Sequence, residues 1–332
     1  MTPNASISHV FPSVLLTASG SYLPEKILTN DDLSKMMDTN DEWIRQRSGI
    51  TQRHIIADDE LTSDMAVKAA RQALDMAGLS VDAIDGIIVA TTTPDDTFPS
   101  TASTVQRKLE AFNAFAFDIQ AVCAGFVYAL DTADAMIKSG KARKMLVIGA
   151  EAFSRILDWT DRGTAVLFGD GAGAVILEAD DHAPDWGILS SVIFTDGRYR
   201  DILYVDGGPA RGQVGTVKMS GQDVFKHAVE KLAHCLDAAI TASGKSASDI
   251  DWLVPHQANI RIINMLQRKL NMSDEKVVRT VDRHANTSAA SIPLAFDEAM
   301  RKNMISAGDI VAFEGIGGGL TWGAAIVRVG RP

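Results

Sequence analysis

Cysteine is scarce in this sequence, and long apolar runs are missing. The two cysteines, Cys123 and Cys235, are too few for a disulfide framework or a four-cysteine zinc site. No apolar run approaches the roughly 18 residues that a membrane-spanning helix needs. Residues 1–10 lack the basic start and apolar core of a signal peptide. These absences predict a reduced, cytoplasmic protein with no membrane span.

An excess of positive charge is also lacking. The chain has 32 Lys and Arg against 42 Asp and Glu, which gives a formal net charge of −10. Because proteins that bind nucleic acids are usually basic, no nucleic-acid partner is expected, and an acidic protein partner would need a local basic patch. Hydrophobic residues (46%) and charged residues (22%) are close to the globular average, which excludes a disordered or fibrous chain.

Helix-like and strand-like stretches alternate along the 332 residues. Continuous apolar runs predict buried strands at 84–91, 115–122, 145–150, 173–177, 251–255, 277–282, 310–314 and 323–327. Helical spacing predicts helices at 60–77, 101–111, 124–140, 223–243, 260–270 and 289–303. This alternation predicts an α/β fold with mostly parallel sheets covered by helices.

Short internal similarities indicate a duplication. Asp82–Ile88 resembles Ser248–Val254, and Gln106–Leu109 recurs as Gln267–Leu270 in the same order. The length also suits two half-domains of about 150 residues each. We therefore expect two halves related by pseudo-symmetry.

Cys123 lies between a predicted strand and a predicted helix. Its sulfur is expected at the helix N-terminus, where unpaired N–H groups and the helix dipole favour a thiolate. We therefore expect its pKa to lie below the value of about 8.5 for a free thiol. A nucleophile and a small buried core residue are both open interpretations. For Cys235, in the middle of a predicted helix, core packing is the preferred one.

His256 and Asn286 each follow a predicted strand, at 251–255 and 277–282. Because residues just past the carboxyl ends of parallel strands converge on one crevice, a site shared with Cys123 is plausible. A structural hydrogen-bonding role is the alternative for both residues. His284, two residues before Asn286, competes with His256 for the role of catalytic histidine.

The two glycine clusters favour different functional interpretations. Gly169–Gly173 leads into an apolar strand rather than a helix, so a dinucleotide-binding loop is a weak interpretation. Gly315–Gly319 has no side chains that would block an approaching group, and its N–H groups could face a developing oxyanion. A plain tight turn is the alternative.

From about Val14 to Val329, the chain resembles the β-ketoacyl-acyl carrier protein synthase III family. The segments that carry the resemblance are Gly20–Pro24, Asp41–Ile44, Cys123–Phe126, Asp161–Thr164, Phe168–Gly173, Pro255–Arg261 and Gly317–Gly323. The resemblance implies a homodimer with the thiolase fold, a five-layered αβαβα arrangement of two pseudo-symmetric halves. These would be residues 12–180, with the cysteine, and 181–332, with the histidine and asparagine. Residues 1–11 have no predicted role.

The same resemblance implies an acyltransferase that initiates fatty acid biosynthesis. It would condense an acyl-CoA primer with malonyl-acyl carrier protein, with loss of carbon dioxide, through an acyl group on Cys123. His256 and Asn286 would donate hydrogen bonds to the malonyl thioester oxygen, and the N–H groups of Cys123 and Gly318 would form an oxyanion hole. No metal or cofactor is implied, because the CoA thioester is a substrate.

Binding residues are implied by their positions in the resemblance. Those for CoA and its pantetheine arm are Thr39, Trp43, Arg47, Arg162, Gly221, Phe225, Ala258 and Asn259. Lys226 and Arg261 would dock the carrier protein, and Arg268 and Lys269 either extend this patch or form an ordinary solvated face. The acyl pocket would involve Phe98 (inserted by a dimer partner), Phe153, Phe168 and Ile316.

The sequence departs from its relatives beside the acyl pocket. Ile316 stands where Phe is common, and Phe153 where a smaller aliphatic residue is frequent. We therefore hypothesise a primer preference shifted away from plain acetyl-CoA.

Other functions remain to be compared with this one. The nearest is a secondary-metabolism relative that passes the acyl group to a different acceptor. A thiolase would need a second cysteine within 315–322, and a hydroxymethylglutaryl-CoA-type synthase would need a glutamate that the segments after Cys123 do not obviously offer. A non-catalytic carrier-binding protein and a nucleotide-dependent oxidoreductase are less favoured.

Overall fold

Two mixed β-sheets form the centre of the structure, a computed structural model that describes residues 11–332. The expectations for residues 1–10 lie outside the described residues. The first sheet has the order β1-β7-β6-β4-β5, with bounds Ser13–Tyr22, Gly171–Asp180, Lys144–Glu151, Gly86–Ala90 and Phe115–Ile119. The second has the order β11-β12-β13-β8, with bounds Trp252–Pro255, Ile310–Gly317, Thr321–Arg328 and Gly187–Thr195.

The prediction of mostly parallel sheets is wrong. In the described chain, β4 pairs in parallel with β5 and β6, and β11 with β12, whereas the pairs β1–β7, β6–β7, β12–β13 and β8–β13 are antiparallel. The short connection from β12 to β13 permits only an antiparallel return, since a parallel neighbour requires a long crossover. The strands β1 and β8, which the sequence analysis did not predict, complete the sheets.

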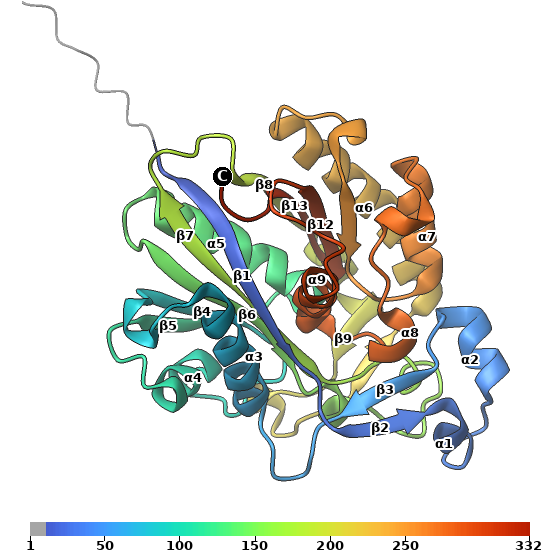
Figure 1. The fold of residues 1–332 in the computed structure, drawn as a ribbon. Helices are drawn as coiled ribbons and strands as arrows, with labels where there is room; N and C mark the ends of the chain where they lie inside the picture. The colour runs from blue at the N-terminus through green and yellow to red at the C-terminus, as the bar shows by residue number, and fades with distance from the viewer. Residues whose placement is uncertain (1–10) are drawn as a thin grey trace, which may run out of the picture.

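Helices cover both sheets and separate them, which gives five layers (Figure 1). The helices α3 (Thr62–Ala77) and α4 (Thr101–Leu109) cover the outer face of the first sheet. On the outer side of the second sheet, α6 (Gly221–Ala242) lies against the strands and α7 (Ile260–Lys269) packs on α6. Between the sheets lie α5 (Gly125–Lys138) and α9 (Ser291–Arg301). The expected αβαβα arrangement is thereby confirmed.

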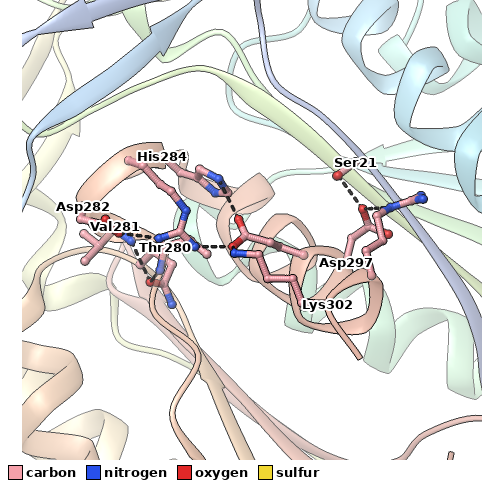
Figure 2. Close-up of polar contacts among 11 residues, drawn as sticks. Ser21, Thr280, Val281, Asp282, His284, Asp297 and Lys302 are labelled. Carbon is pink, nitrogen blue, oxygen red and sulfur yellow. Dashed lines mark hydrogen bonds and ion pairs between the residues drawn. The ribbon is translucent and has the colours of Figure 1, made fainter. Parts of the chain in front are cut away.

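The middle layer is fixed to the first sheet by a buried carboxylate. Asp297 of α9 accepts hydrogen bonds from the hydroxyls of Ser19 (2.8 Å) and Ser21 (2.6 Å) on β1. Figure 2 shows Ser21 and Asp297 in contact. Because a buried carboxylate is costly unless it is hydrogen-bonded, this contact specifies how α9 lies on the sheet.

The sequence similarities occupy corresponding places in the two halves. Asp82–Ile88 and Ser248–Val254 each run from a one-turn 3₁₀ helix into a strand, β4 or β11. Gln106–Leu109 ends α4, and Gln267–Leu270 spans the end of α7. All strands of the first sheet lie within 13–180, and all those of the second within 187–328.

One early segment crosses between the halves. It consists of the hairpin β2 (Lys26–Thr29) and β3 (Gln52–Ile55) with the intervening helices α1 (Asn30–Ser34) and α2 (Asp41–Ser48). Its side chains Leu33, Ile44 and Ile50 are buried in the core that contains α6 and α7. The segment therefore brings residues of the first half to the face of the second (Figure 1). No helix in the part described is both long and apolar enough to cross a membrane.

The predicted strand at 277–282 is wrong beyond its first residues. Val277 forms a single bridge with Leu253, and the chain then turns into the short helix α8 (Val281–His284). The buried Gln257 side chain takes the place of a strand partner, since its Oε1 accepts the N–H groups of Thr280 (2.8 Å) and Val281 (3.1 Å). Figure 2 shows Thr280 and Val281 at the start of α8.

Candidate active site

Cys123 lies in a tight turn between β5 and α5. A one-turn 3₁₀ helix (Val122–Ala124) holds the cysteine, and α5 begins at Gly125. Val122 has a φ of 49°, and Ala285 and Ser288, one residue before and two residues after Asn286, have φ values of 58° and 50°. Side chains rarely adopt this left-handed region, and such strain is concentrated at functional sites.

The C-terminal glycine cluster lies directly against Cys123. A Cβ atom on Gly317 would lie 2.6 Å from the Cys123 nitrogen, and one on Gly315 would lie 2.9 Å from the Cys123 carbonyl oxygen. Only glycine permits this approach of β12, from the second half, to the backbone of the nucleophile candidate. Gly318, the residue expected in the oxyanion hole, lines a different cavity, described below.

Cys123, His256 and Asn286 line a single cavity of about 230 Å³. The structure therefore brings together three residues that are up to 163 positions apart in the sequence. Arg47 and Gly221, which also line this cavity, are exposed, so the cavity runs from the surface to the buried cysteine. The predicted CoA and acyl-pocket residues that share the lining are Trp43, Arg47, Gly221, Phe225, Ala258, Asn259, Phe168 and Ile316.

Two arginines flank the Trp43 ring near the cavity entrance. The guanidinium carbon of Arg47 lies 4.4 Å from the ring centroid, and that of Arg162 lies 5.2 Å from it. Arg162 also donates to the Asp38 carbonyl oxygen (2.8 Å). Arg162 and Thr39 lie beside the cavity rather than in its lining. This arrangement is suited to a flat aromatic ring and anionic groups.

Asn259 connects the two elements at the entrance. Its Oδ1 accepts the Arg261 N–H (2.8 Å) and caps α7, and its Nδ2 donates to the Arg47 carbonyl oxygen of α2 (2.8 Å). Arg261 is exposed, with its guanidinium 5.5 Å from the Phe225 ring, and Lys226 is exposed on α6. Both predicted docking residues thus lie near the entrance and outside the lining.

Lys269 and Arg268, the further members of the predicted patch, differ in their contacts. Lys269 forms an ion pair with Asp237 (3.0 Å), so its charge is partly compensated. Arg268 is exposed at the end of α7.

A pair of stacked aromatic rings separates this cavity from a larger one of about 1100 Å³. The ring centroids of Phe153 and Phe168 are 4.3 Å apart. Phe168 lines the cavity of Cys123, whereas Phe153 and Gly318 line the larger one. Phe98 lines neither cavity, and its side chain is 84% exposed. The four predicted acyl-pocket residues therefore do not share one lining in a single chain.

The expected low pKa of Cys123 is wrong for this structure. Burial raises the pKa of the thiol to about 12, hydrogen bonding from the Ser288 side chain lowers it, and the neighbouring Glu151 carboxylate raises it. The helix N-terminus does not compensate for the lost hydration, because Cys123 is 3% exposed and no cationic side chain acts on it in the described chain. Cys235 is buried in α6, and its thiol donates to the Leu232 carbonyl oxygen (3.3 Å), as expected for core packing.

His256 is held as a neutral imidazole. Burial lowers its pKa to about 3. Its Nδ1 lies 2.5 Å from the Ser291 hydroxyl, whose oxygen already accepts the Gln257 N–H (3.3 Å). A Ser291 hydroxyl that donates to Nδ1 would leave the imidazole proton on Nε2, where it can be donated to a ligand.

The Asn286 amide is oriented by the backbone that follows it. Its Oδ1 accepts the Ser288 N–H (2.9 Å), which leaves the Nδ2 protons for a ligand. His284 has a different role, since its Nε2 pairs with Glu298 (3.2 Å) on α9, outside the cavity. Figure 2 shows His284 directed toward α9. Of the two candidate histidines, His256 is therefore the one beside Cys123 and Asn286.

The sequence analysis missed the side chains that support this trio. Gln257, Ser288, Ser291 and Glu151 are all buried around it. The sequence analysis saw no obvious glutamate in the segments after Cys123 and did not identify Glu151, whose carboxylate raises the pKa of the thiol. A carboxylate directly after the apolar run 145–150 was the sequence feature that could have identified it, since a charge at the end of a buried strand needs partners.

The layered fold, with this cavity between its halves, is that of a condensing enzyme with the thiolase fold. Residues 117–197 match the model for 3-oxoacyl-[acyl-carrier-protein (ACP)] synthase III, and residues 240–329 match the model for its C-terminal part. The β-ketoacyl-[acyl-carrier-protein] synthase III of Rhodospirillum centenum is 58% identical over 319 residues, which cover 95% of this chain and 98% of that protein. That of Erythrobacter litoralis is 57% identical over 94% of this chain and 98% of its own.

Solved structures agree with these sequence relatives. The 3-oxoacyl-[acyl-carrier-protein] synthase III from Aquifex aeolicus is similar with a TM-score of 0.91 and 44% identity, over 95% of this chain and 100% of that one. The priming β-ketosynthase from the R1128 polyketide biosynthetic pathway has a TM-score of 0.92 and 32% identity, over 99% and 100%. This chain belongs to the β-ketoacyl-[acyl-carrier-protein] synthase III family.

Proposed function

We propose that this protein condenses an acyl-CoA primer with malonyl-acyl carrier protein, with loss of carbon dioxide, and so initiates fatty acid biosynthesis. The observation that carries the proposal is the single cavity in which Cys123, His256 and Asn286 meet, below the arginine-flanked Trp43. Membership of the family supports the same reaction. The reaction as proposed needs no metal or cofactor, and the cytoplasmic location remains a prediction.

The first half-reaction transfers the acyl group. The Cys123 sulfur attacks the thioester carbonyl of the primer, the carbonyl oxygen becomes an oxyanion, and CoA leaves as the carbon–sulfur bond breaks. Backbone N–H groups stabilise the oxyanion because they are fixed before charge develops. The Cys123 N–H and the Gly318 N–H are the proposed donors.

The second half-reaction generates a carbanion. Loss of carbon dioxide from the malonyl thioester places negative charge on its carbonyl oxygen, and two preorganised donors there lower the barrier. The amide protons of Asn286 and the Nε2 proton of His256 are suited to this role by their hydrogen-bond partners Ser288 and Ser291. A neutral imidazole donates without needing a proton from solvent. The carbanion then attacks the acyl group on Cys123.

The entrance supports CoA and carrier-protein binding. The adenine ring would lie between Trp43 and Arg162, with Arg47 beside the nucleotide phosphates. The pantetheine arm would pass Thr39, Gly221, Phe225, Ala258 and Asn259. Exposed Lys226 and Arg261 lie near this entrance, so an acidic carrier protein would be attracted there although the net charge is −10.

A homodimer is part of the proposal. β5 is an edge strand with half-buried residues, and an unpaired strand edge is a template for another copy. The exposed Phe98 ring would wall the acyl pocket of the partner. A second copy would thus complete an acyl pocket whose predicted residues are separated in one chain.

The Phe153–Phe168 stack and Ile316 give a structural reason for a shifted primer preference. Ile316 in place of an aromatic residue leaves room on one side of the cavity, and the Phe153–Phe168 stack limits it on the other. We propose a primer preference shifted from acetyl-CoA. Turnover measured across primers of two to ten carbons tests it, and a strict preference for acetyl-CoA would reject it.

Intact-mass analysis with labelled acyl-CoA and malonyl-acyl carrier protein tests the function as a whole. We expect an acyl adduct on Cys123, its disappearance when malonyl-acyl carrier protein is added, and stoichiometric release of carbon dioxide. An adduct that persists without carbon dioxide release would favour the secondary-metabolism acyltransferase. A wild-type protein with no adduct would overturn both.

A further inference from the structure

Glu151, the last residue of β6, is a fully buried carboxylate beside the nucleophile that the mechanism above does not use. Its side chain accepts the N–H of Thr92 (3.0 Å) and the hydroxyls of Thr92 (2.6 Å), Thr93 (2.8 Å) and Ser288 (2.9 Å). An ionised carboxylate can only accept hydrogen bonds, and this set of donors matches that form. These donors favour the ionised form, whereas burial raises the pKa of Glu151 above its ordinary value and so makes it a stronger base than an exposed carboxylate.

Ser288 connects this carboxylate with both halves of the reaction. Its hydroxyl donates to Glu151, its backbone N–H orients the Asn286 amide, and its one-turn helix (Ser288–Ala290) packs against the one that holds Cys123. Ser288 holds this place with a φ of 50°, a conformation that costs free energy in any residue except glycine. The strained backbone thus directs one residue toward two reacting groups.

The thiol requires a base that the histidine does not supply. In the proposed function His256 donates its proton from Nε2, with the Ser291 hydroxyl at Nδ1, so Nε2 has no lone pair for the thiol. Protonating both nitrogens would place a cation in a buried cavity, where burial already disfavours the charged imidazole. Another acceptor must take the thiol proton before the sulfur attacks.

We propose that the Ser288 hydroxyl and the Glu151 carboxylate carry the Cys123 proton during acyl transfer. The S–H bond breaks as its proton moves to the Ser288 oxygen, while the Ser288 proton moves to Glu151 Oε1. The sulfur electron pair forms the bond to the acyl carbon. When the CoA thiolate leaves, it takes the proton back along the same path, so CoA departs as a thiol and Glu151 is again ionised. In this path Ser288 is the residue beside the sulfur, and Glu151 acts through it.

This inference rests on the proposed function, so the test begins with the wild-type acylation of Cys123. The variant Glu151→Gln keeps the shape of the side chain and removes its charge and basicity. We expect the rate of Cys123 alkylation by iodoacetamide, followed by peptide mass, to fall about 10²-fold at pH 7, because general bases contribute at least that much. The rate should then rise about tenfold per pH unit, as thiolate forms only by ionisation to solvent.

The opposite result would overturn the proposal. If Glu151 affected Cys123 only through its negative charge, then removing that charge would lower the thiol pKa and speed alkylation. Alkylation of Glu151→Gln that is as fast as or faster than that of wild type therefore excludes the proton path. If the wild-type protein itself is not acylated by acyl-CoA, it is the proposed function that fails.

Ser288→Ala provides a second variant with a smaller change. It removes the hydroxyl but keeps the backbone N–H that orients Asn286, so Cys123 acylation should fall while carbon dioxide release from malonyl-acyl carrier protein is retained. Equal loss of both activities would contradict the proposal. Ser154→Ala is the matched control, because the Ser154 hydroxyl also donates to a buried carboxylate, Asp170 (2.5 Å), away from the thiol. It should leave the alkylation rate and its pH slope as in wild type, and thermal melting checks folding.

Discussion

The two edge segments that lead to the reacting groups are built differently. β5 pairs with β4 in parallel over five residues, Phe115–Ile119 against Gly86–Ala90, and the chain continues to Cys123. The corresponding segment in the other half, residues 277–284, pairs with β11 only at its start and continues to Asn286. One reacting group thus follows a regular strand, and the other follows a turn fixed by a buried side chain.

The difference shows how the protein positions two chemistries independently. The position of Cys123 is fixed by the many backbone hydrogen bonds of the β4–β5 pairing. In the other segment, Gln257 alone provides an acceptor to Thr280 and Val281 and donates to the carbonyl oxygens of Pro255 (2.7 Å) and Val278 (3.1 Å). We therefore expect substitutions near Cys123 to affect acylation and substitutions near Asn286 to affect decarboxylation.

The largest expected effect is a loss of decarboxylation without a loss of Cys123 acylation. In Asn286→Ala, loss of one oxyanion donor should lower carbon dioxide release from malonyl-acyl carrier protein by about 10²–10³-fold. Acylation of Cys123, measured by intact mass, should remain. Cys123→Ala should show no acyl adduct and retain carbon dioxide release. Equal loss of both activities in Asn286→Ala would show that the two segments do not act separately.

The next effect concerns stability and compares the two edges directly. Gln257→Ala leaves two N–H groups and two carbonyl oxygens without their partner, and should lower the free energy of unfolding by about 3 kcal/mol. Gln106→Ala is the control from the other half, because Gln106 makes one such bond, to the Ala114 carbonyl oxygen before β5 (2.9 Å). Its cost should be about 1 kcal/mol. Urea unfolding at neutral pH measures both, and equal losses would contradict the comparison.

A third effect appears in the pH dependence of stability. The pKa of His256 is about 3 in the folded protein and 6.5 as a free side chain, so the unfolded chain binds the extra proton between these values. Stability should therefore fall as the pH decreases from 6.5 toward 3, with a slope of up to about 1.4 kcal/mol per pH unit from this group. The Cys123 thiol does not titrate in this range.

His256→Gln isolates that contribution, since an amide has no charge to gain. Urea unfolding between pH 7 and pH 4 should show a shallower slope for the variant than for wild type. Parallel slopes would show that His256 is protonated in the folded state near its ordinary pKa.

The smallest expected effect concerns the stacked rings of Phe153 and Phe168, which separate the two cavities. Phe153→Ala removes one ring of the Phe153–Phe168 stack and should connect the cavity of Cys123 with the larger one. We expect kcat/KM for longer primers to rise about tenfold relative to that for acetyl-CoA, the effect of one or two methylene groups in a pocket. Phe153→Leu should give a smaller shift. An unchanged ranking of primers in both variants would exclude a role for these rings.

Much of the fold could be predicted because apolar periodicity reports burial. The helices α3 to α7 and α9, and the strands β4, β6, β7, β11, β12 and β13, lie close to the predicted ranges. The strand direction could not be predicted, because it depends on which strands become neighbours, a long-range property that the periodicity of one segment does not carry. β1 and β8, and the hairpin β2–β3, were missed altogether.

The reacting residues were predicted from their positions after strands, but their environment was not. A cysteine before a helix suggests a stabilised thiolate, yet the thiol is buried away from cationic side chains in the described chain, so burial has the larger effect. Ser288, Ser291 and Gln257 are ordinary polar residues in the sequence. Ser288 contacts Asn286 within a local turn, but Ser291 contacts His256 and Gln257 only when α9 packs beside the segment after β11.

The contact between Gly317 and Cys123 has a consequence for how substrates enter. Because Gly317 of β12 leaves no space for even a methyl group beside the Cys123 backbone, the two halves cannot move apart here without displacing Cys123 relative to His256 and Asn286. Under the proposed function, the primer would therefore enter lengthwise through the opening beside Arg47 and Gly221, with its thioester carried on the extended pantetheine arm.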